Sequence, residues 1–352
     1  MNVGVLINKE RSSNIELYRI IVMFMIVAHH YLVNSGLIQV IENEPLTAKS
    51  AFFYVFGMWG KTGINCFVLI TGYFMCRSKI TLRKFLKLFI QIEFYNIVIS
   101  LIFIFTGYKE FNMESLYGMI WPIKSVSDDF SSCFLLFYLC IPFLNILVHN
   151  MNKRQHYLLL VLCLFIYTIL GTTRIYVTMN YVTWFCVLYI ISSYIRIYGI
   201  NYKDVKIKWG WLSFISIIIS ATSVLVFSTI VNTPWREFVL VSDSNHIMAV
   251  ITSICLFMYF KDFPIKNSAF INKIASCMFG VLLIHANSNT MRKWLWRDTL
   301  DNVGWFQTDY AVFHALVSVT VIFIICVIID IIRQKFVEKP LFEFLKRKVF
   351  IK

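Results

Sequence analysis

Long apolar segments, separated by short polar connections, make up most of the chain. An α-helix needs about 20 residues to cross the hydrocarbon core of a bilayer, and most of these segments approach that length. Helices satisfy their own backbone hydrogen bonds in lipid, so the pattern predicts an all-α, polytopic integral membrane helical bundle of about ten transmembrane helices. The predicted spans are residues 15–35, 51–76, 84–106, 131–149, 157–171, 181–198, 210–231, 246–260, 273–290 and 308–332.

Composition points to one membrane domain. Of the 352 residues, 59% are hydrophobic and only 15% are charged, whereas soluble domains carry about 25% charged residues. We therefore expect a single domain over residues 1–352, with no room for a sizeable soluble domain. After the last predicted span, residues 333–352 have the pattern of a short amphipathic helix on the inner membrane surface.

The basic residues are distributed unevenly between the two sides of the predicted bundle. With the N-terminus placed inside, 23 of the 33 Lys and Arg residues fall on the inner side and 9 on the outer side. This bias predicts a multi-pass protein of the cell membrane with both termini in the cytoplasm. The net charge of +14 follows the same bias and no nucleic-acid-binding motif accompanies it, so we expect contacts with membrane lipids and no nucleic-acid partner.

The nine cysteines lie almost entirely within apolar segments. The chain has no C-x-x-C pair and no Cys/His spacing of the kind that zinc sites use. Cysteines in such a setting behave as small buried hydrophobic residues. We therefore expect no metal site.

The first predicted span carries two ionisable residues, Arg19 and His30, eleven positions apart. Eleven residues at roughly 100° each return to within about 20° of the start, so both side chains lie on one helix face, about 16 Å apart along the axis. Ionisable groups at membrane depth are costly and are functional candidates by default. His29 is rotated by about 80° from this face and is the weaker candidate.

Two further residues extend this set. Glu16 precedes Arg19 by three positions and can pair with its guanidinium group. His285 lies within another apolar segment, and its burial is costly unless a partner satisfies it. Simpler interpretations stay open: an ion pair at a helix end for Glu16 and Arg19, and hydrogen-bonded helix-packing residues for His30 and His285.

A basic cluster follows the second span and includes Arg83, Lys84 and Lys87. These side chains can supply charge and donors to phosphate groups, or they anchor the loop on the cytoplasmic side. The outer connections contain tryptophans such as Trp121 and Trp305. Their rings are suited to anchoring at the interface, and aromatic faces also stack on sugars.

Five stretches carry a family resemblance. They are Glu16-Leu-Tyr-Arg19-x10-His30, Phe67-Val-Leu-Ile-Thr71-Gly72-Tyr73-Phe74, Tyr138-Leu-Cys-Ile-Pro142-Phe143, Phe279-Gly-Val-Leu-Leu-Ile-His285 and Glu338-Lys339-Pro340. Taken in this order, they resemble the motifs of the membrane-bound acyltransferase family 3, the bacterial O-acyltransferases that modify surface polysaccharides. Thr71 stands where the family usually has serine.

The resemblance implies an O-acyltransferase, most simply an O-acetyltransferase, of the bacterial cytoplasmic membrane. Its donor would be cytoplasmic acyl-CoA, usually acetyl-CoA, and its acceptor a hydroxyl of a surface polysaccharide or lipid-linked glycan. The implied roles are catalysis by His30, Arg19 and Glu16, donor binding by Tyr73, Arg83, Lys84 and Lys87, and acceptor binding by His285 and Asn287.

The sequence leaves open two roles for His30 and two other classes of protein. His30 would act as a general base toward the acceptor hydroxyl or would itself carry the acyl group. A proton-coupled transporter of a small solute or glycan would also use intramembrane ionisable groups. A lipid-linked glycosyltransferase would need an acidic outer loop, for which Asp128 and Asp129 are the candidates.

Overall fold

The computed structural model describes residues 12–127, 129–173, 175, 177–200, 207–230 and 238–348, and the regular elements within these ranges are all helices. The predicted all-helical class is therefore confirmed. The first ten elements are α1 (Ser13–Val33), α2 (Leu37–Glu42), α3 (Ala48–Gly57), α4 (Gly60–Met75), α5 (Leu82–Phe105), α6 (Met113–Ile120), α7 (Phe130–Asn150), α8 (Lys153–Cys163), the π-helical η1 (Leu164–Leu170) and α9 (Tyr181–Tyr198). The remaining elements are α10 (Trp209–Ile230), α11 (Ile247–Lys261), α12 (Ala269–Ala275), α13 (Met278–His285), α14 (Asn289–Lys293), η3 (Trp294–Thr299), α15 (Asn302–Phe306), α16 (Ala311–Arg333), η4 (Gln334–Glu338) and α17 (Lys339–Lys348).

Eight helical stretches within the described residues are long and apolar enough to cross a membrane. They are Ser13–Val33, Ala48–Met75, Leu82–Phe105, Phe130–Asn150, Lys153–Leu170, Tyr181–Tyr198, Trp209–Ile230 and Ala311–Arg347. A ninth is added if the bent pair of Ala269–His285 and Asn289–Thr299 crosses as one span.

All ten predicted spans coincide with helices, but two of them depart from a simple crossing. The span predicted at 246–260 is α11, whose 15 residues are short for a bilayer. The span predicted at 273–290 breaks after His285 and turns by 90°, because Ser288 starts a new helix by accepting from the backbone N–H of Met291. Length and composition thus support eight or nine crossings, and the count of ten and the cytoplasmic termini stay predictions.

Polar side chains fix where several helices begin. Thr47, Thr81, Asp129 and Asn180 accept hydrogen bonds from backbone N–H groups in the first turns of α3, α5, α7 and α9. These bonds satisfy donors that a helix start otherwise leaves unpaired. Each cap stands where a polar connection meets an apolar run, so the predicted boundaries lie within a few residues of the observed ones.

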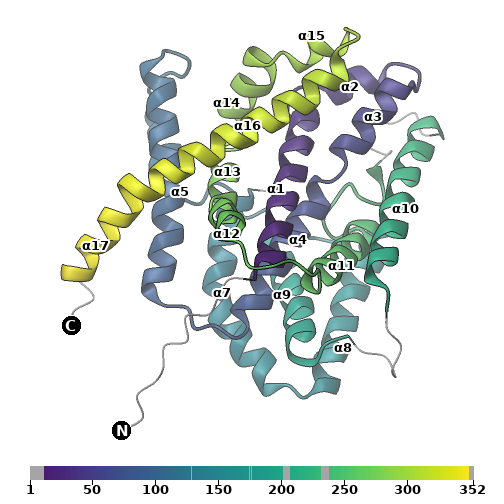
Figure 1. Cartoon of the computed structure of the whole chain (residues 1–352), viewed down its shortest axis with the longest axis vertical. Helices are drawn as coiled ribbons and strands as arrows, with labels where there is room; N and C mark the ends of the chain where they lie inside the picture. The colour runs from purple at the N-terminus through teal and green to yellow at the C-terminus, as the bar shows by residue number, and fades with distance from the viewer. Residues whose placement is uncertain are drawn as a thin grey trace.

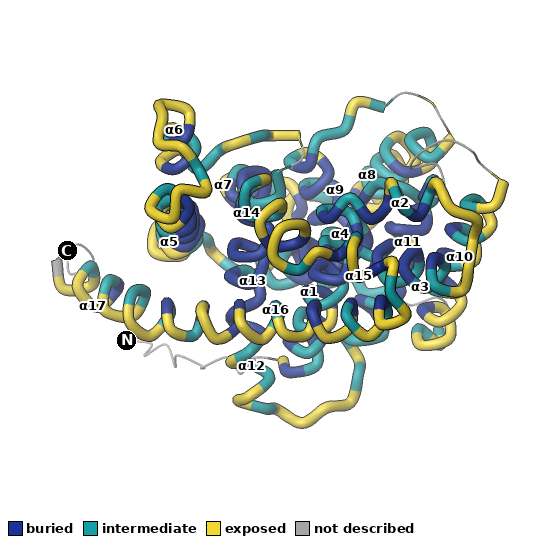
Figure 2. Tube along the Cα trace, turned by 90° about the horizontal axis from the view of Figure 1, so that it is seen from above, coloured by how far each residue is buried: buried dark blue, intermediate teal, exposed yellow. Residues whose placement is uncertain are grey.

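The helix α1 lies at the centre of the bundle, in contact with α4, α11, α13 and α16 (Figure 1). Figure 2 shows mainly buried backbone at this centre, whereas α10 and α16 run along exposed edges. Within an apolar stretch of 18 residues of Ala48–Met75, 72% of the residues are buried, whereas 22% are buried in the corresponding stretch of Trp209–Ile230. The exposed apolar side chains of the outer helices suit contact with lipid, which is as apolar as they are.

The short amphipathic helix predicted for residues 333–352 continues the last long apolar helix. Residues 311–347 form one helical run in which η4, a single π-helical segment, joins α16 to α17, visible as one long yellow helix in Figure 1. Phe342 is buried and Phe344 is exposed, so α17 does have two unlike faces. The continuous backbone places the start of α17 beside α5, with Lys87 of α5 paired to Glu338 at the end of η4.

Candidate active site

Two histidines far apart in the sequence meet between α1 and α13. Nδ1 of His30 lies 2.9 Å from Nε2 of His285, the last residue of α13. Nδ1 of His285 lies 2.6 Å from the carbonyl oxygen of Val281, which can only accept, so this nitrogen carries a proton. In the neutral pair, Nε2 of His285 then accepts from Nδ1–H of His30. This arrangement leaves Nε2 of His30 unprotonated and able to act as a base.

His30 faces a cavity of about 180 Å³, called here the His30 cavity. Its polar lining residues include His29, His30, Lys61, Asn287 and Arg292. Lys61 donates to the hydroxyl of Tyr181 at 2.6 Å and lies 3.6 Å from a carboxylate oxygen of Asp243. Tyr181 and Asp243 thus hold the ammonium group of Lys61 in the cavity wall, where it can interact with a polar substrate.

His29 also lines this cavity but is committed to a backbone partner. Its Nδ1 lies 2.6 Å from the carbonyl oxygen of Gly57, at the end of α3. Gly60 leaves room for the imidazole, because a Cβ at that position would overlap the ring. The contact fastens α1 to the turn between α3 and α4, which supports a structural role for His29.

A second cavity, of about 310 Å³, lies beside Arg19 and is called here the Arg19 cavity. Its cationic lining residues are Arg19, Lys84, Lys87 and Arg333. The ion pair predicted from the sequence is present, with Nη1 of Arg19 3.0 Å from Oε2 of Glu16. Since guanidinium and ammonium groups together favour anionic oxygen ligands, this cavity is suited to phosphate groups.

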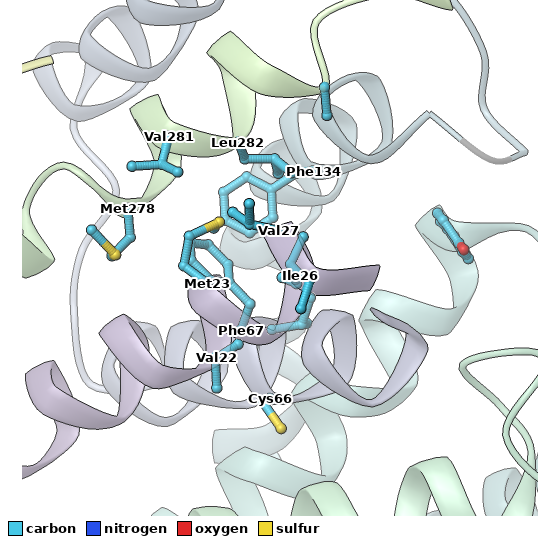
Figure 3. Close-up of a cluster of buried hydrophobic side chains, with 14 of the residues drawn as sticks. Val22, Met23, Ile26, Val27, Cys66, Phe67, Phe134, Met278, Val281 and Leu282 are labelled. Atoms are coloured by element: carbon cyan, nitrogen blue, oxygen red, sulfur yellow. The ribbon is translucent and has the colours of Figure 1, made fainter. Parts of the chain in front are cut away.

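Figure 3 shows a cluster of buried apolar side chains, called here the apolar layer, and members of this cluster line each of the two cavities. Phe67, Phe134 and Phe279 line the Arg19 cavity, while Ile26 and Leu282 line the His30 cavity. The labelled members of the layer in Figure 3 are Val22, Met23, Ile26, Val27, Cys66, Phe67, Phe134, Met278, Val281 and Leu282. Arg19 and His30 thus share a helix face, as their spacing requires, but each opens to its own cavity.

Arg83 and Tyr73, predicted to bind the donor with Lys84 and Lys87, have protein partners away from the Arg19 cavity. The guanidinium of Arg83 lies 5.9 Å from the ring centroid of Phe342 in α17. The hydroxyl of Tyr73 accepts from Nη1 of Arg196 at 2.6 Å, and that guanidinium also covers its ring. Of the four residues predicted to bind the donor, Lys84 and Lys87 therefore line the Arg19 cavity. Arg83 and Tyr73 do not.

A groove of about 610 Å³, called here the α6 groove, adjoins the His30 cavity. The two spaces share Asp129, Asn287 and Arg292 as lining residues, so the groove leads toward the histidine pair. Tyr117 and Trp121 form part of its wall, with their rings stacked 5.8 Å apart. An aromatic surface beside polar groups is suited to a ligand that has both an apolar face and hydroxyl groups.

Asn287, predicted to bind the acceptor, lies at the junction of groove and cavity. Its Nδ2 donates to Oδ1 of Asn96 at 3.3 Å, and Nζ of Lys124 donates to the same oxygen at 2.9 Å and to the carbonyl of Asn287 at 3.3 Å. Burial lowers the pKa of Lys124 from its ordinary value, with Asp129 and Glu93 opposing the change. These bonds join α5, the connection between α6 and α7, and the break after α13.

Asp129, part of the acidic pair considered for a glycosyltransferase, begins α7. Its carboxylate accepts from the backbone N–H of Ser132 and from the hydroxyl of Ser131, both at 2.8 Å. A carboxylate held in this way stabilises the helix start, and we assign it that role. Asp128 lies outside the described residues.

One charged pair was not identified from the sequence. Asp330 and Arg333 lie near the end of α16, with Nε of Arg333 2.7 Å from Oδ1 of Asp330, and Arg333 lines the Arg19 cavity. The spacing of acid and arginine is the same as in Glu16-x-x-Arg19, again at the edge of an apolar run. That repeated pattern is the signal by which the sequence could have revealed the pair.

The described residues form an all-helical bundle with helices of membrane-spanning length, a histidine pair at one polar cavity and a cluster of cations at a second. The chain belongs to the acyltransferase 3 family, because the family model described as an acyltransferase domain matches residues 12–331, nearly the whole chain. The resemblance inferred from the five motifs is thereby confirmed. No curated protein and no solved structure matches the chain. Family membership supports a membrane acyltransferase.

Proposed function

We propose that this protein is an O-acyltransferase, most simply an O-acetyltransferase, of the bacterial cytoplasmic membrane. It takes an acyl group from acyl-CoA, with acetyl-CoA as the expected donor, and passes it to a hydroxyl of a surface polysaccharide or of its lipid-linked precursor. The observation that carries the proposal is the pair of His30 and His285. Its hydrogen bonds leave Nε2 of His30 unprotonated at a cavity that adjoins the α6 groove.

In the proposed reaction His30 is the general base. Its Nε2 accepts the proton of the acceptor hydroxyl while the hydroxyl oxygen attacks the carbonyl carbon of the thioester. The carbon–sulfur bond then breaks, and the departing thiolate takes the proton from Nε2 to give free coenzyme A and an ester. His285 accepts from Nδ1–H of His30 throughout, which holds the ring in one orientation and favours the transient imidazolium.

The donor would bind in the Arg19 cavity. Lys84 and Lys87 supply positive charge for its phosphate groups, and Arg19, paired with Glu16, supplies a planar group of donors nearer the membrane interior. Arg83 lies at the exposed start of the same helix as the lysines. It would raise the local concentration of an anionic donor through its charge rather than by direct contact.

The acyl group must pass the apolar layer to reach His30. The ring centroids of Phe67 and Phe134 lie 6.2 Å apart, and that of Phe279 lies 5.6 Å from Phe134. The arm of coenzyme A that bears the thioester is narrow, so it would take the space of these rings when they rotate.

The acceptor would approach along the α6 groove. Tyr117 and Trp121 offer aromatic faces of the kind on which sugar rings stack. Nearer to His30, Arg292 offers hydrogen-bond donors, and Asn287, whose Nδ2 already donates to Asn96 and Leu283, offers its amide oxygen as an acceptor. Because the groove and the His30 cavity share lining residues, a glycan lying along the groove would bring a hydroxyl group toward the base. This geometry supports a saccharide acceptor over a small soluble alcohol.

The test uses membrane vesicles that contain the full chain and acetyl-CoA labelled in the acetyl group. Release of the coenzyme A thiol and transfer of label to glycans of the host membrane are measured together. The proposal predicts both, and predicts that Arg19→Ala and His30→Ala strongly lower both at matched expression. If the wild type neither consumes acetyl-CoA nor labels a glycan, the proposal is wrong, and proton-coupled uptake becomes the next assay.

A further inference from the structure

Four charged side chains form a connected network at the edge of the Arg19 cavity. Arg333 contacts Asp330 through Nε at 2.7 Å and Glu338 through Nη1 at 3.0 Å. The other oxygen of Glu338 lies 2.6 Å from Nζ of Lys87. Glu338 therefore joins two cations, one from α16 and one from α5, and Arg333, Glu338 and Lys87 all line the cavity.

The Asp330 end of the network is rigidly held. Asp330 is fully buried, and its carboxylate accepts from the hydroxyl of Tyr95 at 2.7 Å and from Nε2 of Gln334 at 2.7 Å. Gly280 on the neighbouring helix gives it space, because a Cβ there would overlap the carboxylate. A buried carboxylate that accepts this many hydrogen bonds is held in place, so it fixes the guanidinium of Arg333.

The Glu338 end is held much less firmly. Glu338 ends the π-helical segment η4, a type of distortion that frequently occurs at functional sites. Its side chain keeps 15% exposure, and that of its partner Lys87 keeps 56%. An ion pair with an exposed lysine contributes little to stability, so the contact of Glu338 with Lys87 is lost at small cost. Its contact with the buried Arg333 is costly to lose unless another anion takes the place of the carboxylate.

We infer that Arg333 is a phosphate-binding residue of the donor site, that Asp330 positions it, and that Glu338 neutralises Arg333 and Lys87 until a phosphate replaces it. The inference rests on the proposed function, in which acyl-CoA binds in this cavity. A phosphate carries about 1.5 to 2 negative charges and three acceptor oxygens, whereas the carboxylate carries one charge. Two cations that converge on one carboxylate therefore favour the phosphate once it arrives.

The chemistry identifies a phosphate ester but two sources could supply it: coenzyme A or the headgroup of an anionic lipid. Direct binding of coenzyme A to the purified full chain in phosphatidylcholine nanodiscs separates binding from turnover. The same measurement in nanodiscs that contain phosphatidic acid reports competition by a headgroup. We expect coenzyme A to bind in both, with phosphatidic acid weakening it by less than about three-fold.

Three variants test the assignment of residues. Glu338→Gln removes the competing charge and keeps the size, so the Kd for coenzyme A should fall by about three-fold. Arg333→Lys keeps the charge but loses the planar set of donors, so the Kd should rise by about ten-fold. Lys335→Gln, on the same π-helical segment but packed against Phe336, is the control and should bind like the wild type.

Two donors distinguish this inference from the proposed function. Arg333→Lys should raise the KM for acetyl-CoA several-fold more than the KM for S-acetyl-pantetheine, which has no phosphate. Equal changes for the two donors, or weaker binding of coenzyme A by Glu338→Gln, would overturn the inference even if acyl transfer is intact. Tighter binding by Glu338→Gln in a chain that transfers no acyl group would support the phosphate site and count against the proposed function alone. Strong displacement of coenzyme A by phosphatidic acid would also overturn the inference, because Arg333 and Lys87 would then bind a lipid headgroup instead.

Discussion

Nδ1 of His30 and Nε2 of His285 lie 2.9 Å apart, although 255 positions separate the two residues in the chain. Only the packing of α13 against α1 brings them together. The carbonyl of Val281 fixes the tautomer of His285, and His285 then fixes that of His30. A single helix turn of α13 therefore determines which nitrogen of His30 is free to accept a proton.

The first prediction separates the two adjacent histidines of α1. His30→Ala should lower acyl transfer by about 10²- to 10⁴-fold, because a general base of this kind contributes that much. His29→Ala loses the contact with Gly57 and should lower thermal stability while retaining most of the transfer rate. The measurement is labelled-acetyl transfer at matched expression, alongside thermal unfolding in detergent. Equal loss of transfer in both variants would contradict the assignment of His30 as the base and of His29 as a structural residue.

The second prediction concerns His285 as a positioning residue. His285→Leu removes the acceptor of the Nδ1–H of His30, so kcat should fall by about ten- to hundred-fold with little change in the KM for acetyl-CoA. His285→Gln offers an amide oxygen at a similar reach and should recover part of the loss. The two variants are compared by steady-state kinetics over a range of pH. Identical rates for Leu and Gln would indicate that His285 only fills space.

The helix positions could be predicted because they follow from local chemistry. Apolar runs of the length of a bilayer and polar caps such as Thr81 and Asp129 stand next to each other in the chain, and the structure keeps them. The pair of Glu16 and Arg19 was predictable for the same reason, since three positions along one helix always bring two side chains together.

Contacts between helices could not be predicted in this way. The partner of Tyr73 is Arg196, on another helix, and no periodicity in either segment indicates it. The pairing of His30 with His285 is likewise a property of the packed bundle. The break after His285 also changed a predicted straight span into a bent pair, because a cap three residues later outweighed the apolar pattern.

The third prediction tests the space reserved for Asp330. Gly280→Ala would drive a methyl group into that carboxylate, and overpacking of this kind costs about 1–3 kcal/mol. Thermal unfolding of the purified chain in detergent should show the loss, together with weaker binding of coenzyme A. Gly118→Ala is the matched control, since a Cβ at position 118 meets nothing within 4 Å. A Gly280→Ala chain as stable as the control would show that α13 and α16 are packed less closely than described.

The last prediction assigns the α6 groove to the acceptor. Trp121 stacks on Tyr117 inside the groove, whereas Trp305 stacks on His314 elsewhere on the molecule. Trp121→Ala should raise the KM for the glycan acceptor by about ten-fold, which is the change expected when one aromatic contact is lost. The KM for acetyl-CoA should stay unchanged. Trp305→Ala removes a ring of the same size and similar exposure, and should affect neither constant. If the two variants lower activity alike, the rings act only as anchors at the membrane interface, and the acceptor must reach His30 by another route.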